Sequence, residues 1–293
     1  MASLVLGVAG AAVGFVIGGP AGASLGFNIG STLGGLINQP NTKTIGPRIN
    51  ELKLQNSEYG VLIPILFGRR KVSGNVVWTS PLIETEKKTK SGKGGGKTTS
   101  LTYSYSVNIA VGFFFEETKV LKRLWADTVV IYDSINVLPP NFTVYLGTET
   151  QAPDSTIQTW EGVANTPAYR GLSYIVLKDF VIDNYGKRVP SFFAEFESKD
   201  TDVNGTETLT SCVNRISLLA GLVLSDIDTT NLSGTTLGYT ISAEGAAKDF
   251  ILPLASTYGF DVIESDNKVK FVTRTGATTE TINFGEVVID GTR

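Results

Sequence analysis

In SLTYSYSVNIAVGFFF (residues 100–115), apolar and polar side chains alternate from Leu101 to Val111. A period of two sustained this long is typical of a half-buried antiparallel strand. The stretch YGVLIPILFGRRKVSGNVVWTS (residues 59–80) adds two apolar runs joined by a basic turn, which predict two more strands. The apolar faces of such strands become buried only when the strands pair inside a sandwich or barrel. We therefore expect the rest of the chain to be organised around this sheet.

Composition excludes several classes of protein. The chain has 293 residues, 42% of them hydrophobic, which is enough to fill a real core. The formal net charge of −3 gives no basic footprint for nucleic acid, and a mildly acidic body lets DNA pass without binding it. Histidine is absent and Cys212 is the single cysteine, so Ser-His-Asp and Cys-His catalysis, internal disulfides and ordinary zinc sites are excluded within these residues.

The first forty residues carry a regular glycine pattern in an almost uncharged stretch. On a helix, glycines four residues apart form a groove that another backbone can approach closely. We favour a helical hairpin or bent helix that packs against copies of itself or against a partner; a transmembrane helix and a cleaved signal peptide are the alternatives, in that order. The predicted assembly residues are Gly10, Gly14, Gly18, Gly22, Gly26, Gly30 and Gly34.

Breaks in the pattern divide the chain into three parts. Residues 1–40 form the glycine-rich apolar helical segment, residues 41–200 the β-rich body, and residues 201–293 a small α+β module with two helices and a hairpin. Ser242 is the predicted N-cap of the second of these helices. A further strand is expected over residues 282–289, and the pattern suggests that the chain continues beyond it. The predicted fold class is α+β, mostly β.

The glycine-rich tip SGKGGGKTT (residues 91–99) resembles the end of a phosphate-binding loop. That motif requires glycine where Ser91 stands and a helix directly afterwards, whereas a strand follows here. We interpret the segment as a flexible tip between two long strands, in which Lys93 and Lys97 contact a partner. Cys212 falls on the apolar stripe of a helix and is expected to be a core residue.

Several stretches of the sequence resemble stretches that occur in the same order in one protein family. They are IPILFGRRKVSGNVVW (63–78), YSYSVNIAVGFFFEE (103–117), RLWADTVVIYD (123–133), YLGTETQAPDSTI (145–157), EGVANTPAYRGLSYIVLKDF (161–180), RVPSFFAEFE (188–197), GLVLSDIDTTNLSGTTLGYTI (221–241) and ILPLASTYGFDVIESDNKVKFV (251–272). These stretches, together with the glycine-rich amino end, resemble the tail hub (tip attachment) proteins of long-tailed phages and gene-transfer agents.

The resemblance implies a structural role without cofactor or metal. Family members form a homotrimer at the distal end of the tail tube, in which tube-like antiparallel β-barrel or sandwich domains make a pseudo-sixfold ring. The implied partners are the distal tail protein, other tail tip proteins and the tape-measure protein, while genomic DNA passes through without specific binding. The implied location is the virion tail tip, after synthesis in the host cytoplasm. Family members usually run far longer than this sequence, so host recognition is not assigned to these residues.

Three hypotheses about function follow. The first is a trimeric hub that closes the tail tube, with the glycine segment as a plug that gates DNA ejection. The second is a membrane-active protein whose glycine segment inserts into the host envelope, with the β body as its carrier. The third is an enzyme that uses carboxylate pairs such as Glu116-Glu117 or Asp226 and Asp228, which we disfavour because neighbouring strand residues point to opposite faces. We predict no catalytic residues.

Overall fold

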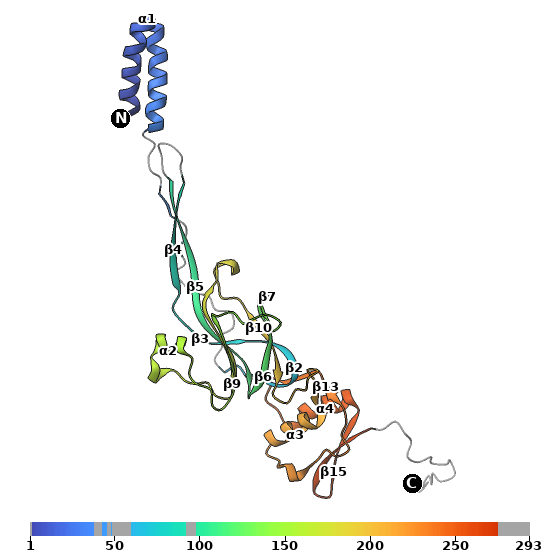
Figure 1. Cartoon of the computed structure of the whole chain (residues 1–293). Coiled ribbons are helices and arrows are strands. Elements are labelled where there is room, and N and C mark those ends of the chain that lie inside the picture. The colour runs from blue at the N-terminus through green and yellow to red at the C-terminus, as the bar shows by residue number, and fades with distance from the viewer. Residues whose placement is uncertain (1, 38–42, 46–47, 49–59, 92–97, 275–293) are drawn as a thin grey trace, which may run out of the picture. The chain divides into compact units, whose positions relative to one another are not determined.

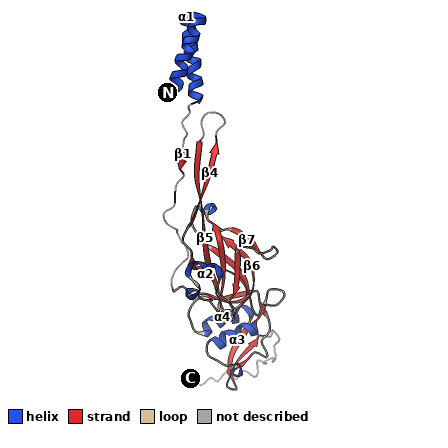
Figure 2. Cartoon of the chain, turned by 60° about the vertical axis from the view of Figure 1, so that its left-hand side comes forward, coloured by secondary structure: helices blue, strands red, loops and turns tan. Residues whose placement is uncertain are grey.

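The computed structural model describes residues 2–37, 43–45, 48, 60–91 and 98–274 (Figure 1). The strand expected over residues 282–289 and the two tip lysines, Lys93 and Lys97, lie outside this range. Strands predominate and helices are few (Figure 2), so the predicted α+β, mostly β fold class is confirmed. The described residues cluster into two compact units, one within residues 1–55, 79–109 and 178–190 and the other within residues 56–78, 110–177 and 191–293.

The first unit contains helix α1 (Ala2–Ile37) and a β arm. Strand β4 (Ile83–Ser91) runs antiparallel to the first part of β5 (Thr98–Phe115), as the flanks of the glycine-rich tip predicted. The short strand β1 (Lys43–Ile45) pairs with β5 in parallel. Asp183, from a distant part of the sequence, holds the arm in place. Its carboxylate accepts hydrogen bonds from the Ser104 hydroxyl and from the backbone N–H of Tyr105.

The second unit is built on a curled sheet whose strands follow the order β7-β6-β10-β2-β5-β9-β8. The sheet curls so that β6 comes close to β9 and β8. The hydroxyl oxygen of Thr118 on β6 lies 2.9 Å from that of Ser173 on β9, and the Ser173 hydroxyl donates to the carbonyl of Leu146 on β8. Strands β10 and β2, β10 and β6, β6 and β7, and β8 and β9 pair antiparallel, whereas β2 meets β5 in parallel at Ile65 and Phe115. The bounds are β2 Ile65–Ser73, β3 Asn75–Thr79, β6 Thr118–Ala126, β7 Val129–Asp133, β8 Phe142–Leu146, β9 Leu172–Val181 and β10 Phe192–Ser198.

Burial along β5 follows the predicted alternation only in its first half. Leu101, Tyr103 and Tyr105 are buried while the residues between them are not, but both faces are buried from Val107 to Phe114. Ala110 on the face predicted to be polar packs in a cluster with Ile157 of helix α2 (Ser155–Glu161). A covering element from a distant part of the sequence thus changes a one-sided strand into a two-sided one.

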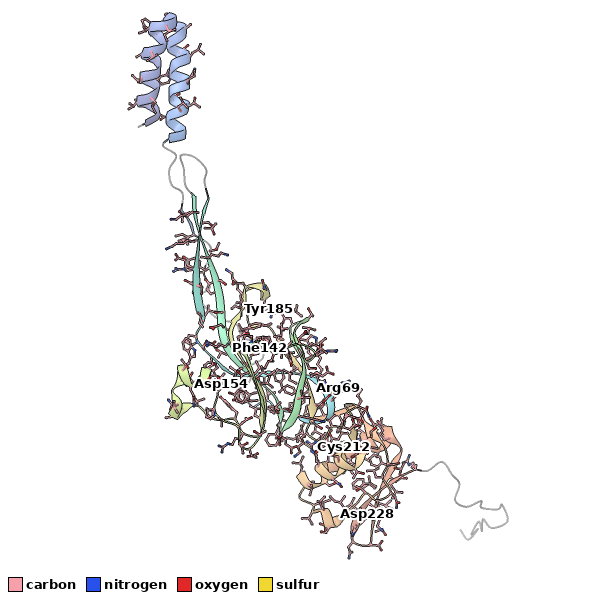
Figure 3. All side chains as sticks on the ribbon, in the orientation of Figure 1. Arg69, Phe142, Asp154, Tyr185, Cys212 and Asp228 are labelled. Atoms are coloured by element: carbon pink, nitrogen blue, oxygen red, sulfur yellow. The ribbon has the colours of Figure 1, made fainter. Side chains whose placement is uncertain are left out.

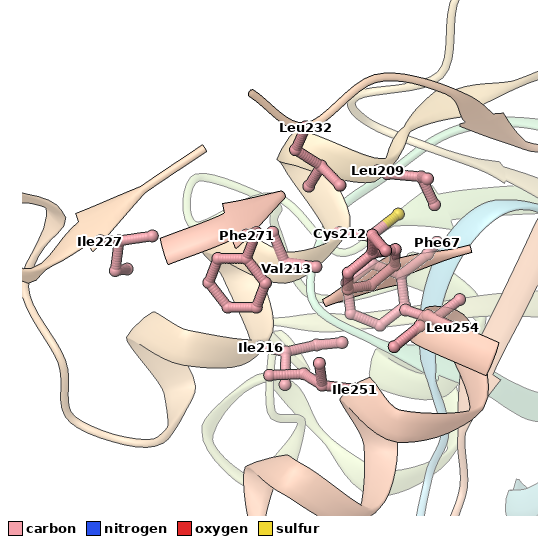
Figure 4. Packing of buried hydrophobic residues seen from close by; sticks show 12 residues of the cluster. Phe67, Leu209, Cys212, Val213, Ile216, Ile227, Leu232, Ile251, Leu254 and Phe271 are labelled. Carbon is pink, nitrogen blue, oxygen red and sulfur yellow. The ribbon is translucent and has the colours of Figure 1, made fainter. Parts of the chain in front are cut away.

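The carboxyl-terminal residues form the predicted helices and hairpin. Helices α3 (Leu209–Leu219) and α4 (Ala247–Tyr258) pack with the sheet β12-β16-β15 (Ile227–Asp228, Lys268–Thr273, Phe260–Ser265) around one apolar core (Figure 4). A short ladder of β11 (Glu207–Thr208) with β13 (Thr235–Thr236) completes the module. Strand β14 (Gly238–Ile241) then pairs with β2, and Phe67 of β2 is buried in the core of the module.

The helix cap predicted at Ser242 is wrong. Helix α4 begins at Ala247, and its first turn is closed by Asp249, whose carboxylate accepts the backbone N–H of Ala246. Because an acidic side chain three residues into a helix can satisfy the capping position from within, the helix does not need a hydroxyl before it. Ser242 instead lines a cavity beside β2.

Arg215 on α3 joins the module to the curled sheet. Its guanidinium binds Glu116 at 2.7 Å and Glu207 at 3.2 Å, and it lies over the Phe67 ring at 4.5 Å from the centroid. Glu207 is fully buried and also accepts the backbone N–H of Gly68. Burial lowers the pKa of Arg215, but the hydrogen bond with Glu116 and the charge of Glu207 outweigh it, so the pKa is raised.

We predict that Arg215→Met strongly destabilises the chain. The substitution keeps much of the shape but leaves Glu207 buried without a counter-charge, and removing one partner of a buried pair costs about 3–5 kcal/mol. Thermal unfolding followed by circular dichroism measures the effect. The matched control is Arg274→Met, which removes an exposed pair with Asp261 and should barely change the melting temperature. Equal melting temperatures for the two variants would contradict the role of Arg215.

Candidate functional site: a glycine-packed helical hairpin

Helix α1 is two helices joined by a sharp turn at Gly18-Gly19, and the two lie side by side (Figures 1 and 2). Gly19 has a φ of 61°, a left-handed conformation that favours glycine, and Pro20 follows as the first residue of the second helix. The sequence predicted a hairpin or a bent helix, and the structure contains a hairpin.

Glycines form the contact between the two helices. A Cβ atom added at Gly10 would overlap the carbonyl oxygen of Gly26, and one added at Gly14 would overlap that of Gly22. Gly30 meets the backbone of Leu6 in the same way. The backbones therefore touch directly, which only residues without a side chain allow.

The remaining two predicted glycines lie differently. A Cβ atom added at Gly18 would meet nothing within 4 Å, because this residue belongs to the turn. Gly34 lies in the second helix, but its contacts fall outside the described residues. The groove expected from the glycine spacing is thus filled along its described length by the chain's own second helix.

Aliphatic side chains cover the outside of the hairpin. Val16 and Ile17, next to the turn, are 85% and 82% exposed. Both helices contribute further exposed large apolar residues, namely Leu4, Val5, Val8, Val13, Phe15, Leu25, Phe27, Ile29 and Leu33. The segment Ser3–Leu33 is long and apolar enough to cross a membrane by length and composition. In a helical hairpin of a soluble protein, large apolar side chains usually fill the contact between the helices. Here small residues form that contact and the large apolar side chains lie on the outside.

Polar groups in the hairpin are few and largely satisfied. The sequence has no charged side chain before Lys43. The hydroxyls of Ser24 and Ser31 donate to the carbonyls of Ala21 and Asn28 at 2.8 and 3.0 Å, and the hydroxyl of Thr32 also donates to Asn28. Such bonds to the preceding helical turn let hydroxyl groups leave water at low cost.

Three of the four acidic residues considered as catalytic pairs have structural partners. Glu116 binds Arg215, whereas Asp226 and Asp228 accept backbone N–H groups of Val223 and Thr230 in tight turns. Cys212 on α3 is buried, as Figures 3 and 4 show, and burial followed by the nearby charge of Glu207 raises the pKa of its thiol well above the ordinary value. Within the described residues, no group of three or more Asp, Glu, Cys or His side chains is placed to hold a metal.

Comparison with known proteins gives one kind of match. Neither a scan against known protein families nor a search of curated proteins finds a match. Among solved structures, the chain is similar to a chain of "Virion of native gene transfer agent (GTA) particle", with a TM-score of 0.61 and 26% sequence identity. The match covers 88% of this chain and 64% of that chain, so the sequence spans less than two thirds of the length of the chain it matches.

We predict that Gly14→Leu opens the hairpin, because its side chain has no space beside Gly22. Spin labels on Leu4→Cys and Leu33→Cys, both exposed positions near the open end, report the change. Packed helices lie about 8–10 Å apart, so the labels should be within roughly 20 Å in the parent chain. A single straight helix would place them about 44 Å apart.

The control for this measurement is Gly18→Ala, whose added methyl group meets open space. It should keep the short label distance. A short distance that also persists in Gly14→Leu would show that glycine packing does not hold the helices together.

Proposed function

We propose that this chain is a structural subunit of a phage or phage-like virion, and specifically the hub protein of the tail tip. The observation that carries the proposal is the similarity, over 88% of the chain, to a chain of a gene transfer agent virion. The stretches that resemble tail hub proteins favour the more specific role. In this role the protein has no catalytic residues, needs no cofactor, and resides at the virion tail tip after synthesis in the host cytoplasm.

The proposed assembly is a homotrimeric ring that closes the distal end of the tail tube. Strand β7 supports it with an open apolar edge: among the described residues it pairs only with β6, and Val129 and Val130 are 54% and 49% exposed. Soluble proteins usually protect such an edge with charges or proline, because it offers hydrogen bonds to any strand of another chain. We assign this edge to the contact between neighbouring subunits.

The proposed partners are the distal tail protein, other tail tip proteins and the tape-measure protein. Genomic DNA passes through the ring without specific binding, in keeping with a net charge of −3. In the assembled particle the hairpins from the three subunits gather in the lumen and gate DNA ejection. The basic tip that carries Lys93 and Lys97 is assigned to contacts with a partner protein.

We expect the purified chain to form particles of three times its mass of 31.3 kDa, visible as rings by electron microscopy. Val130→Lys should convert these particles to monomers, because a lysine on the open edge of β7 opposes strand pairing. The control is Val203→Lys at a position that is 97% exposed in a loop, which should leave the trimers intact. A chain that stays monomeric at all concentrations would refute the ring.

Deleting residues 4–37 tests the plug separately. Particles assembled with the shortened chain should lose their DNA early or fail to deliver it, because nothing then closes the lumen. Normal assembly together with normal DNA delivery would exclude a gating role for the hairpin.

A membrane-active protein is the second candidate function. The specific observation in its favour is the hairpin itself, whose exterior is apolar and whose segment Ser3–Leu33 has the apolar composition of a membrane span. In this alternative the β body carries the hairpin to the host envelope.

A further inference from the structure

The exterior of the hairpin fits a lipid environment better than water. Only 6% of its most apolar window is buried within the chain, and its large apolar residues are exposed on both helices and at the turn. A helix that lies on a protein surface has one apolar face and one polar face, whereas an element that is apolar on all sides belongs in a core or in a membrane. The glycines form the contact between the two helices and line an apolar groove beside it, and the rest of the outer surface is mainly aliphatic.

The polar groups of the hairpin are also compatible with lipid. Backbone groups in the interior of each helix are satisfied within that helix, and three hydroxyls bond back to their own helix. Two further polar side chains remain: Ser3 lies near the open end, and the exposed amide of Asn28 lies about halfway along the second helix. A polar amide without charge at that depth is tolerated far better than a lysine or an aspartate.

The dimensions favour entry by the turn first. The first helix, from Ala2 to the turn at Gly18-Gly19, is about 24 Å long, and the second, ending at Ile37, is about 27 Å long. A bilayer has a hydrocarbon core of about 30 Å, so the hairpin reaches most of the way across it. Both open ends stay on the side of entry, where the first charged residue, Lys43, follows.

We propose that the hairpin enters a lipid bilayer with its Phe15–Pro20 turn leading, as a closed two-helix unit whose glycine contacts stay within one chain. This inference rests on the membrane role given above as the second candidate and names its partner and direction of entry. Lipid is favoured over a second copy of the chain because a protein partner would cover one side of the hairpin, and aliphatic side chains project from both helices and from the turn.

The test uses the full chain with a fluorescent label on Val16→Cys. The native Cys212 is buried with an exposed fraction of 0%, so the label goes to the new cysteine. With vesicles of phosphatidylcholine, we expect a blue-shifted emission that is quenched by lipids carrying a quencher on their acyl chains. Because the hairpin carries no charge, the shift should not depend on salt. A label on Val203→Cys, a 97% exposed position of the body, should show neither effect.

A second variant distinguishes entry of the turn into the bilayer from non-specific adsorption of the chain to vesicles. Ile17→Lys changes an 82% exposed side chain and leaves the hairpin contacts in place. A lysine at bilayer depth should weaken vesicle binding about a hundredfold. Binding equal to that of the parent chain, or a Val16 label that is insensitive to vesicles, would overturn the proposal.

An emission shift that appears with rising protein concentration and does not change when vesicles are added would also overturn the proposal, since the occupant would then be another copy of the chain. Electron microscopy of the same sample shows whether rings form. Failure of the hub and failure of membrane entry are therefore seen independently.

Discussion

Strand β2 is the element on which the folded body depends, because it is hydrogen-bonded along both edges. It pairs with β10 through residues 69–73 and with β14 through residues 65–68. Phe67 is completely buried in the core of the carboxyl-terminal module, and Gly68, with a φ of 68°, lets β14 approach closely. A single strand thus carries the hydrogen bonds of the sheet and the central side chain of the module.

Electrostatics strengthen the same junction. Arg215 stacks on the ring of Phe67 and binds carboxylates from the curled sheet and from β11. Glu207 connects this arginine to the backbone of Gly68 and to the hydroxyl of Ser198. A buried charge network tolerates few alternative arrangements, because each unpaired member would be costly. The geometry of this junction suits a rigid structural subunit better than a site of chemistry.

The hairpin is not stabilised by a buried apolar core or by buried charges. Its stability comes from direct backbone contact at glycines, while the residues that would fill an ordinary core point outward. This arrangement has little reason to exist in water alone, since exposed aliphatic surface is unfavourable there. The outer surface therefore requires apolar surroundings, which the proposed lumen or the proposed bilayer would supply.

The sequence alone determined the local structure wherever the apolar side chains recur with the period of a strand or a helix. The alternation at 101–107 and the helical stripe around Cys212 each led to the correct element, because backbone geometry and side-chain pattern repeat with the same period. Tertiary structure decided what these elements meet. Neither the pairing of β14 with β2 nor the cover over Ala110 leaves a local signal. The glycine spacing requires a close neighbour, but only the turn at Gly18-Gly19 determines that the neighbour is the chain itself.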